Sequence, residues 1–231
     1  ALLKNAALDP AHLDLDRLVE TLLTLRPAAA YLPLDGGVAR VEAAIEGIAG
    51  LYREHDAAMR RAGLIDFDDQ KLRACRAIEA MPEMGREVRG AWDEVVVDEF
   101  QDVNRLDFEL VRALARRATL LVAGDDDQAI YGFRGCTSEY IVDLERHAGR
   151  SVASYELSAN YRSPPEILAV ADRLIRHNRG RIPKSPVARR TTPAEIHRLR
   201  HDAVEAEADA LAEWVVRTVR GEGPGARWSD V

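Results

Sequence analysis

The chain has 231 residues, 47% of them hydrophobic and 31% charged, enough to bury a substantial core in one or two domains. Its net charge of −7 excludes a uniformly basic nucleic-acid coat but leaves room for a local basic groove. No apolar run approaches the ~20 residues that span a bilayer, and no stretch resembles a signal peptide. The two cysteines, Cys75 and Cys136, stand far apart without metal-ligand spacing. We therefore expect a soluble, cytoplasmic protein with no membrane partner.

The first part of the chain, residues 1–91, is predicted to be mostly helical. Apolar residues recur there at helical spacing and mark one face of an amphipathic helix: Val41, Ile45, Ile48, Tyr52 and Met59. Prolines and a glycine pair predict a loop over residues 26–37. Further on, Asp66, Asp68 and Asp69 precede or begin another helix, a pattern typical of helix capping.

From Trp92 the pattern changes to alternating strand and helix. The valines at 95–97 predict a short buried strand, residues 119–123 predict a second, and the segment between them has the apolar spacing of a helix. A strand–helix–strand unit implies that the two strands are parallel. Their acidic ends then share the carboxyl edge of the sheet, where open α/β sheets bind ligands. We expect Asp98 and Glu99 to lie beside Asp125 at such a site.

A third unit is predicted after residue 153. Residues 155–157 have the character of a strand, and Ser163 to Glu166 match the spacing of a capping box at the start of a helix. Alternation over residues 195–200 predicts another strand, and apolar spacing from Val204 to Val219 predicts a last helix.

The segment after the first strand has the form of a Walker B motif, a hydrophobic run followed by Asp98 and Glu99. A nucleotide-bound Mg²⁺ needs a hard oxygen ligand at a fixed strand end, and the attacking water needs a neighbouring carboxylate. A plain strand followed by a solvated turn would give the same letters.

Residues 122–135, VAGDDDQAIYGFRG, form a more specific pattern. Gly124 permits close backbone approach, and Gln128 ends a polar stretch that can contact a phosphate. Tyr131 and Phe133 then alternate with glycine just before Arg134, as expected for side chains that stack on single-stranded bases. An ordinary buried aromatic pair is the alternative.

Three segments together resemble motifs II, III and IV of the UvrD/Rep group of superfamily 1 DNA helicases: VVVDEFQD, VAGDDDQAIYGFRG and LSANYRSPPEIL. The resemblance implies an α/β fold of RecA-like P-loop NTPase core domains, with a partial parallel sheet and a helical insert domain. Residues 1–91 would be the C-terminal part of the insert (1B-like), 92–152 part of the first core domain, and 153–231 the start of the second.

The same resemblance implies a nucleotide site for ATP and Mg²⁺. Asp98 would bind Mg²⁺, and Glu99 would be the catalytic base. Gln128 would contact the γ-phosphate. Tyr161 would stack on the adenine, and Arg162 would act as an arginine finger from the second core domain.

On the DNA side, Tyr131 and Phe133 would contact single-stranded bases, although the family usually has tryptophan where Phe133 stands. Arg134 would pair with the acids of motif II, and Asp102 and Asp125 would be structural or coupling residues. The resemblance implies 3′-to-5′ movement, with single-stranded DNA and single-strand/duplex junctions as substrates, in repair, replication or recombination.

The printed sequence contains no GxxxxGK[ST] phosphate loop. We expect an internal piece of a longer helicase whose isolated chain does not hydrolyse ATP. A naturally truncated, non-catalytic relative that binds DNA or protein is the main alternative, and a helicase–nuclease subunit is another. A third treats Gly124 to Asp127 as the metal-binding acids of a glycosyltransferase or phosphohydrolase, which leaves the aromatic residues unexplained.

Overall fold

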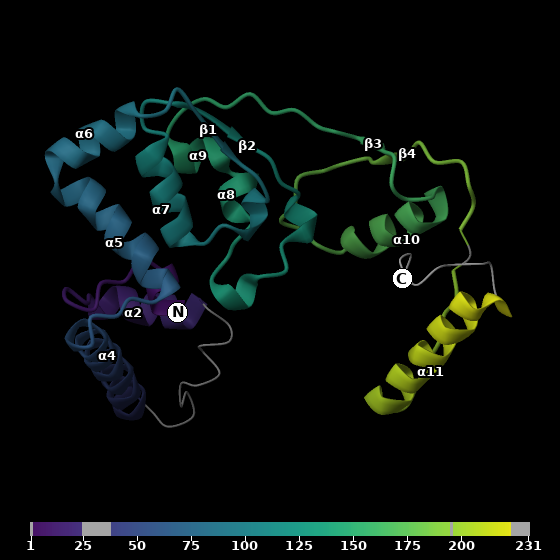
Figure 1. Cartoon of the computed structure of the whole chain (residues 1–231), viewed down its shortest axis with the longest axis horizontal. Helices are drawn as coiled ribbons and strands as arrows, with labels where there is room; N and C mark the ends of the chain where they lie inside the picture. Colours follow the sequence, from purple (N-terminus) through teal and green to yellow (C-terminus); the bar gives the residue numbers. More distant parts are fainter. Residues whose placement is uncertain (1, 25–37, 195, 223–231) are drawn as a thin grey trace. The chain divides into compact units, whose positions relative to one another are not determined.

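A computed structural model describes residues 2–24, 38–194 and 196–222 (Figure 1). The chain divides into two compact units, one of residues Ala1–Glu156 with His177–Lys184 and one of residues Leu157–Arg176 with Ser185–Val231. Within the described ranges, no helix is both long enough and apolar enough to cross a bilayer. The predicted loop over residues 26–37 lies outside those ranges.

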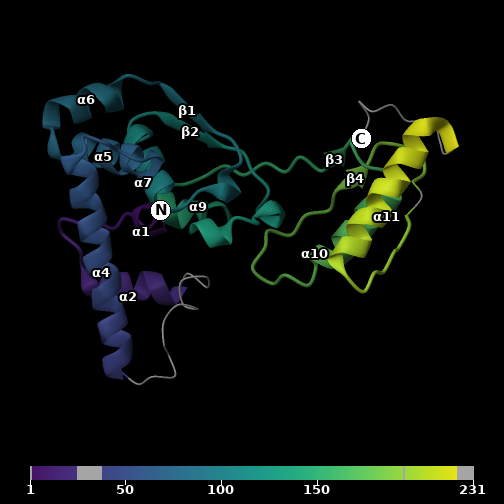
Figure 2. The same cartoon turned by 60° about the horizontal axis from the view of Figure 1, so that its bottom comes forward.

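The helices at the start of the first unit form a core of their own. They are α1 (Leu2–Asn5), α2 (Leu15–Thr24) and α4 (Val38–Arg61), and α2 packs across α4 (Figure 2). The predicted apolar face of α4 is confirmed from Val41 to Tyr52, because Ile45 and Tyr52 are buried in this core while Val41 and Ile48 pack against it; Met59 is not part of it. Tyr52 also donates a hydrogen bond to the backbone oxygen of Leu8 at 2.8 Å.

The next helices are α5 (Phe67–Ala80) and α6 (Pro82–Gly90). The predicted cap is confirmed: the Asp66 carboxylate accepts a hydrogen bond from Asp69 N at 2.7 Å, and Asp69 returns one to Asp66 N at 3.3 Å. Lys4, only 1% exposed, forms ion pairs with Asp66 at 2.6 Å and Asp69 at 2.7 Å. These ion pairs attach α1 to the start of α5.

The predicted strand–helix–strand unit is confirmed. Strands β1 (Glu94–Val97) and β2 (Thr119–Val122) are parallel, with Val97 opposite Val122, and α7 (Arg105–Leu114) connects them. Val97 and Val122 pack on one face of this pair against a core that contains Phe100 and Phe108. On the other face Val96 and Leu121 are 65% and 59% exposed, so the prediction that both strands are buried is wrong for that face.

Short helical segments complete the first unit. Three 3₁₀ turns lie at Phe100–Asp102 (η1), Asp126–Gln128 (η2) and Gly132–Arg134 (η3), followed by α8 (Glu139–Val142) and α9 (Leu144–Ala148). Tyr140 of α8 stacks on Phe108 with ring centres 4.4 Å apart. This contact closes the same face of the β1–β2 pair that α7 covers.

The second unit contains β3 (Ala159–Asn160), α10 (Pro165–Ile175), β4 (Val187–Ala188), α11 (Val204–Arg217) and the π-helical turn Thr218–Glu222. Strands β3 and β4 are parallel and pair over two residues each. The predicted strand at 155–157 is wrong, because only residues 159–160 find a partner strand and Leu157 is 97% exposed. The strand expected at 195–200 is also wrong for residues 196–200, which have no regular structure; residue 195 is outside the described ranges.

The capping box predicted from Ser163 to Glu166 is absent. Pro164 occupies the N-cap position of α10 and makes no side-chain cap hydrogen bond. The Glu166 carboxylate accepts a hydrogen bond from Ala194 N at 3.3 Å instead.

Candidate nucleotide site

The carboxyl edge of the β1–β2 pair brings the predicted acidic residues together. Asp98 and Glu99 follow β1 directly, and Asp125 follows β2 after two residues. Backbone hydrogen bonds continue past the strands, from Ala123 N to Val97 O at 2.8 Å and from Phe100 N to Ala123 O at 2.9 Å. The predicted placement at one edge is confirmed, while the chemical role of each residue stays a prediction.

The backbone turns sharply at Glu99. Its φ of 51° and ψ of 43° lie in the left-handed region, which costs a non-glycine residue about 1–3 kcal/mol. The Asp98 carboxylate supports the turn by accepting a hydrogen bond from Glu99 N at 2.9 Å. Both acidic side chains are exposed.

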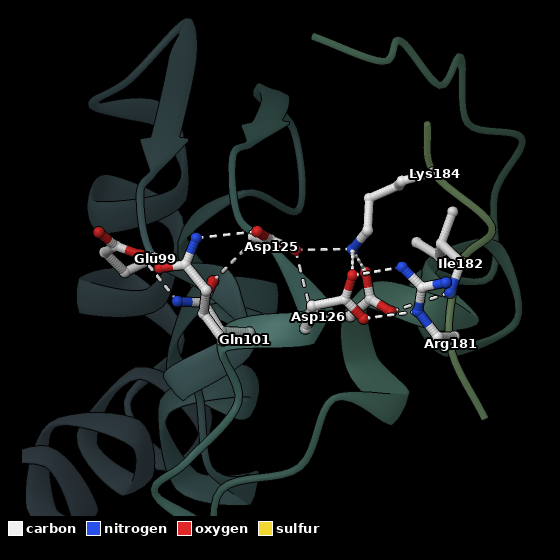
Figure 3. Close-up of polar contacts among 9 residues, drawn as sticks. Glu99, Gln101, Asp125, Asp126, Arg181, Ile182 and Lys184 are labelled. Carbon is white, nitrogen blue, oxygen red and sulfur yellow. Dashed lines mark hydrogen bonds and ion pairs between the residues drawn. The ribbon is translucent and has the colours of Figure 1, made fainter. Parts of the chain in front are cut away.

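Gln101 connects the two loops of this edge, and its role was not predicted from the sequence. Its Nε2 donates a hydrogen bond to Glu99 Oε2 at 2.7 Å, and its Oε1 accepts one from Asp125 N at 3.0 Å (Figure 3). Gln101 is 2% exposed, so the N–H and C=O groups of its amide need these partners for their hydrogen bonds. At Gly124 an added Cβ would lie 2.6 Å from Gln101 Oε1, so this bridge requires glycine there.

The Asp125 carboxylate orients Gln128. Asp125 Oδ2 accepts a hydrogen bond from Gln128 Nε2 at 2.8 Å, and Oδ1 accepts one from Asp127 N at 3.1 Å. Burial raises the pKa of Asp125, but hydrogen bonds from Lys184 and Gln128 outweigh it and leave this pKa below its usual value. Asp125 therefore holds the predicted phosphate-contacting side chain as a charged acceptor.

Two basic residues from a distant segment also reach this loop, and neither was predicted. Lys184 Nζ lies 2.6 Å from Asp125 Oδ1 and 3.1 Å from Asp127 Oδ2, and it also contacts Asp126. Arg181 binds Asp127 through two hydrogen bonds of 2.7 and 2.5 Å. In the sequence they belong to a basic stretch 54 or more residues from these aspartates, and nothing in that stretch indicates which residues it contacts.

Tyr131 and Phe133 follow this loop and form an aromatic pair. Their ring centres are 5.9 Å apart, and Phe133 is 59% exposed. The guanidinium of Arg134 lies 5.5 Å from the centre of the Tyr131 ring. Among the described residues no ion pair joins Arg134 to Asp98 or Glu99, so the predicted pairing with motif II is absent here. The Arg134 side chain stacks on its own loop instead.

Asp102, predicted as a structural residue, lies at the end of η1. Its Oδ1 is buried and has no hydrogen-bond partner among the described residues. Its backbone oxygen accepts a hydrogen bond from Cys136 Sγ at 2.8 Å, which joins η1 to the segment after η3.

Motif IV residues lie in the second unit. Asn160 Oδ1 accepts hydrogen bonds from Arg162 N at 3.0 Å and Ser163 N at 2.7 Å, and this side chain fixes the loop. Tyr161 is 77% exposed and Arg162 is also exposed. The loop presents both side chains to solvent, and the predicted approach of Arg162 to the nucleotide stays a prediction.

The donor set at the strand edge fits Mg²⁺ bound together with a nucleotide. Within the described ranges no group of three or more His, Cys, Asp or Glu side chains is arranged to hold a metal alone. Mg²⁺ in phosphoryl-transfer sites takes one or two carboxylates and completes its shell with phosphate oxygens and water. Asp98, exposed at the strand end, fits that single-carboxylate role.

Comparison with known proteins identifies the class. The family model described as UvrD/REP helicase N-terminal domain matches residues 16–149. The ATP-dependent DNA helicase UvrD1 of Mycobacterium tuberculosis is 37% identical over 142 residues, covering 58% of this chain and 18% of that protein. The ATP-dependent DNA helicase PcrA of Staphylococcus aureus is 31% identical over 186 residues, covering 80% of this chain and 25% of that protein. PcrA of Leuconostoc citreum is 33% identical over 153 residues, with coverages of 66% and 20%.

The chain belongs to the UvrD/REP helicase N-terminal domain family. Its matches span about a fifth to a quarter of the length of these relatives. The resemblance of its motifs to superfamily 1 DNA helicases is therefore confirmed, and its parallel strands agree with the α/β fold of that family.

Proposed function

We propose that this chain supplies motifs II, III and IV of an ATP-dependent DNA helicase or translocase. The observation that carries the proposal is the single strand edge that holds Asp98, Glu99 and Asp125, with Gln128 hydrogen-bonded to Asp125. The DNA-facing aromatic pair follows Gln128 within the same loop. A nucleotide site and a base-stacking surface thus share one short segment.

The chain's own residues divide the work of hydrolysis. Bound Mg²⁺ and ATP supply the phosphoryl group and the charge that activates it. Asp98 would offer one carboxylate oxygen to the metal. Glu99 accepts a proton from the attacking water at Oε1, because Gln101 already occupies Oε2. Gln128 contacts the γ-phosphate, and Arg162 stabilises developing charge when the second core domain closes, with Tyr161 on the adenine.

The same loop couples hydrolysis to DNA. Gln128 and Tyr131 are three positions apart, so in this proposal a short segment connects the phosphate contact to the base-stacking residues. We propose 3′-to-5′ movement on single-stranded DNA, with unwinding at single-strand/duplex junctions, by a cytoplasmic protein of DNA repair, replication or recombination. In this proposal residues 1–91 are part of a helical insert, 92–152 part of the first core domain, and 153–231 the start of the second.

The 231-residue chain alone is proposed to be inactive as an ATPase. Its sequence lacks the loop whose backbone N–H groups and lysine bind the β- and γ-phosphates. The test compares this chain with the product of the full open reading frame that encodes it, with and without oligo-dT. We expect DNA-stimulated Mg-ATPase activity only from the full product. Robust hydrolysis by the 231-residue chain would contradict the proposal. A full product that encodes no phosphate loop and binds DNA without hydrolysis would establish the non-catalytic alternative.

A further inference from the structure

The segment His177–Lys184 belongs to the first compact unit, although the residues on both sides of it belong to the second. It is attached to the first unit by its contacts with residues 125–128, which we call the η2 loop. Ile182 N donates a hydrogen bond to Asp126 Oδ2 at 2.8 Å, between the side-chain contacts of Arg181 and Lys184 (Figure 3). We call residues 181–184 the basic clamp.

The basic clamp offsets the repulsion among the carboxylates of the η2 loop. Asp125, Asp126 and Asp127 are consecutive, and their side chains are 39%, 3% and 15% exposed. Carboxylates so close together repel one another unless cations lie among them. A lysine ammonium has three N–H donors, and Lys184 contacts all three carboxylates. Its side chain is 20% exposed, so the ammonium is largely shielded from water.

The contact between Lys184 and Asp125 is linked by further hydrogen bonds to Gln128 and to Glu99. In Figure 3, Asp125 lies between Lys184 on one side and Gln101 on the other. Lys184 binds Asp125 Oδ1, which leaves Oδ2 to accept from Gln128, while Asp125 N donates to Gln101. Gln101 in turn donates to Glu99. A change at Lys184 therefore reaches Gln128 through one shared carboxylate.

We propose that Lys184 is a positioning residue for Gln128, and that Arg181 seats the clamp by binding Asp127. The inference rests on the proposed function for one point, the contact of Gln128 with the γ-phosphate. In this arrangement, release of the clamp leaves the Asp125 carboxylate bonded, among the described residues, only to Asp127 N and Gln128, and so loosens its hold on the Gln128 side chain. The clamp segment is continuous with the second unit at both ends, so its attachment is a direct route by which that unit influences the phosphate-contacting residue.

The test uses the 231-residue chain without nucleotide or DNA. Side-chain amide signals of ¹⁵N-labelled protein are recorded for the wild type, K184M and K184R, with the Gln128 signal assigned by its loss in Q128A. Amide exchange at Ile182 reports clamp attachment independently. In K184M we expect the Gln128 signal to move to the position of an unrestrained glutamine and Ile182 to exchange about tenfold faster, as for a lost charged hydrogen bond. K184R keeps the charge and should restore part of both effects.

The matched control is K71M. Lys71 pairs with Asp107 at 2.7 Å and is 29% exposed, but it does not contact the η2 loop. It should leave Gln128 and Ile182 unchanged. If K184M loses the dispersed signals of β1 and β2, R181Q replaces it and should shift Gln128 in the same direction by a smaller amount.

Faster exchange at Ile182 with an unmoved Gln128 signal would overturn the proposal, and so would K184M with neither change. Because no nucleotide is present, these outcomes do not bear on the ATPase proposal. A failure of DNA-stimulated hydrolysis, in turn, would leave the clamp result standing.

Discussion

The buried amide of Gln101 donates a hydrogen bond to the Glu99 carboxylate at 2.7 Å and accepts one from Asp125 N at 3.0 Å. One side chain thereby ties the predicted catalytic base on one loop to the loop that follows the neighbouring strand and carries Gln128, the predicted phosphate-contacting residue. This bridge gives two loops of separate sequence motifs a fixed relative position.

Replacing Gln101 by alanine should destabilise the first unit. The substitution leaves the Asp125 amide without its acceptor in a partly buried site, which costs about 1–3 kcal/mol in the free energy of unfolding. Urea denaturation followed by circular dichroism measures the change. Q70A is the control, because Gln70 is exposed on α5 and alanine favours a helix. Equal stability of Q101A and Q70A would show that the bridge contributes nothing.

Replacing Gly124 by alanine should produce a similar loss for a steric reason. The new Cβ would lie 2.6 Å from Gln101 Oε1 and 3.0 Å from Phe100 N, and overpacking of this kind costs about 1–3 kcal/mol. G47A is the matched control, since Gly47 lies inside α4 with no atom within 4 Å of its added Cβ. It should stabilise the chain by about 0.5–1 kcal/mol. Thermal melts of the two variants should therefore shift in opposite directions.

The strand edge also shows which features could be predicted from the sequence and which could not. The valine run and its acidic end predicted the parallel pair and the shared edge, because strand pairing follows from local periodicity and connection length. The cap of α5 was predicted from Asp66 and Asp69 for the same local reason. Gln101 was missed because its partners depend on how two loops meet at the edge.

The misses elsewhere have related causes. Lys184 meets Asp125 across 59 positions, and a solvated basic stretch gives no sign of such a partner. The strand expected at 155–157 failed because a strand needs a neighbour, and β4 pairs instead with Ala159 and Asn160. Arg134 was assigned to motif II by family resemblance, whereas its guanidinium lies against Tyr131 in the same turn.

The basic clamp should detach in acid. Hydrogen bonds from Arg181 lower the pKa of Asp127, and for Asp125 the hydrogen bonds from Lys184 and Gln128 lower the pKa despite the opposing effect of burial. A carboxylate with a lowered folded pKa adds stability above its unfolded pKa, about 3.9, and this is lost as pH falls through the folded value. We expect protection of the Ile182 amide to hold from about pH 8 to 5 and to fall below about pH 4.

Lys184 sets the alkaline limit of the same clamp. Burial lowers its pKa, but the hydrogen bonds that Lys184 donates to the three aspartates outweigh burial and leave the pKa raised. Its contribution is therefore complete below about pH 10.4, the unfolded value, and is lost as pH rises through the folded value. Protection at Ile182, corrected for intrinsic exchange, should be flat between the two limits. A steady change in the protection of the Ile182 amide across neutral pH would contradict this assignment of the ion pairs.

The aromatic pair should carry single-stranded DNA binding. Truncating Phe133 or Tyr131 to alanine should weaken binding of an oligo-dT by about 10–100-fold, since each stacked base contributes about 1–3 kcal/mol. F133W should bind at least as tightly as the wild type because its ring is larger. Fluorescence anisotropy measures the affinity at fixed salt. The control Y155A removes an aromatic side chain that is 88% exposed and lies outside this loop, and it should bind normally.

The most direct test of the account is ATP hydrolysis by the full open-reading-frame product with Glu99→Gln. If the Glu99 carboxylate is the general base at the strand edge, kcat should fall by about 10²–10⁴-fold while binding of Mg-ATP is retained. A DNA-stimulated kcat equal to that of the wild type would contradict the central claim that the acidic end of β1 performs the chemistry.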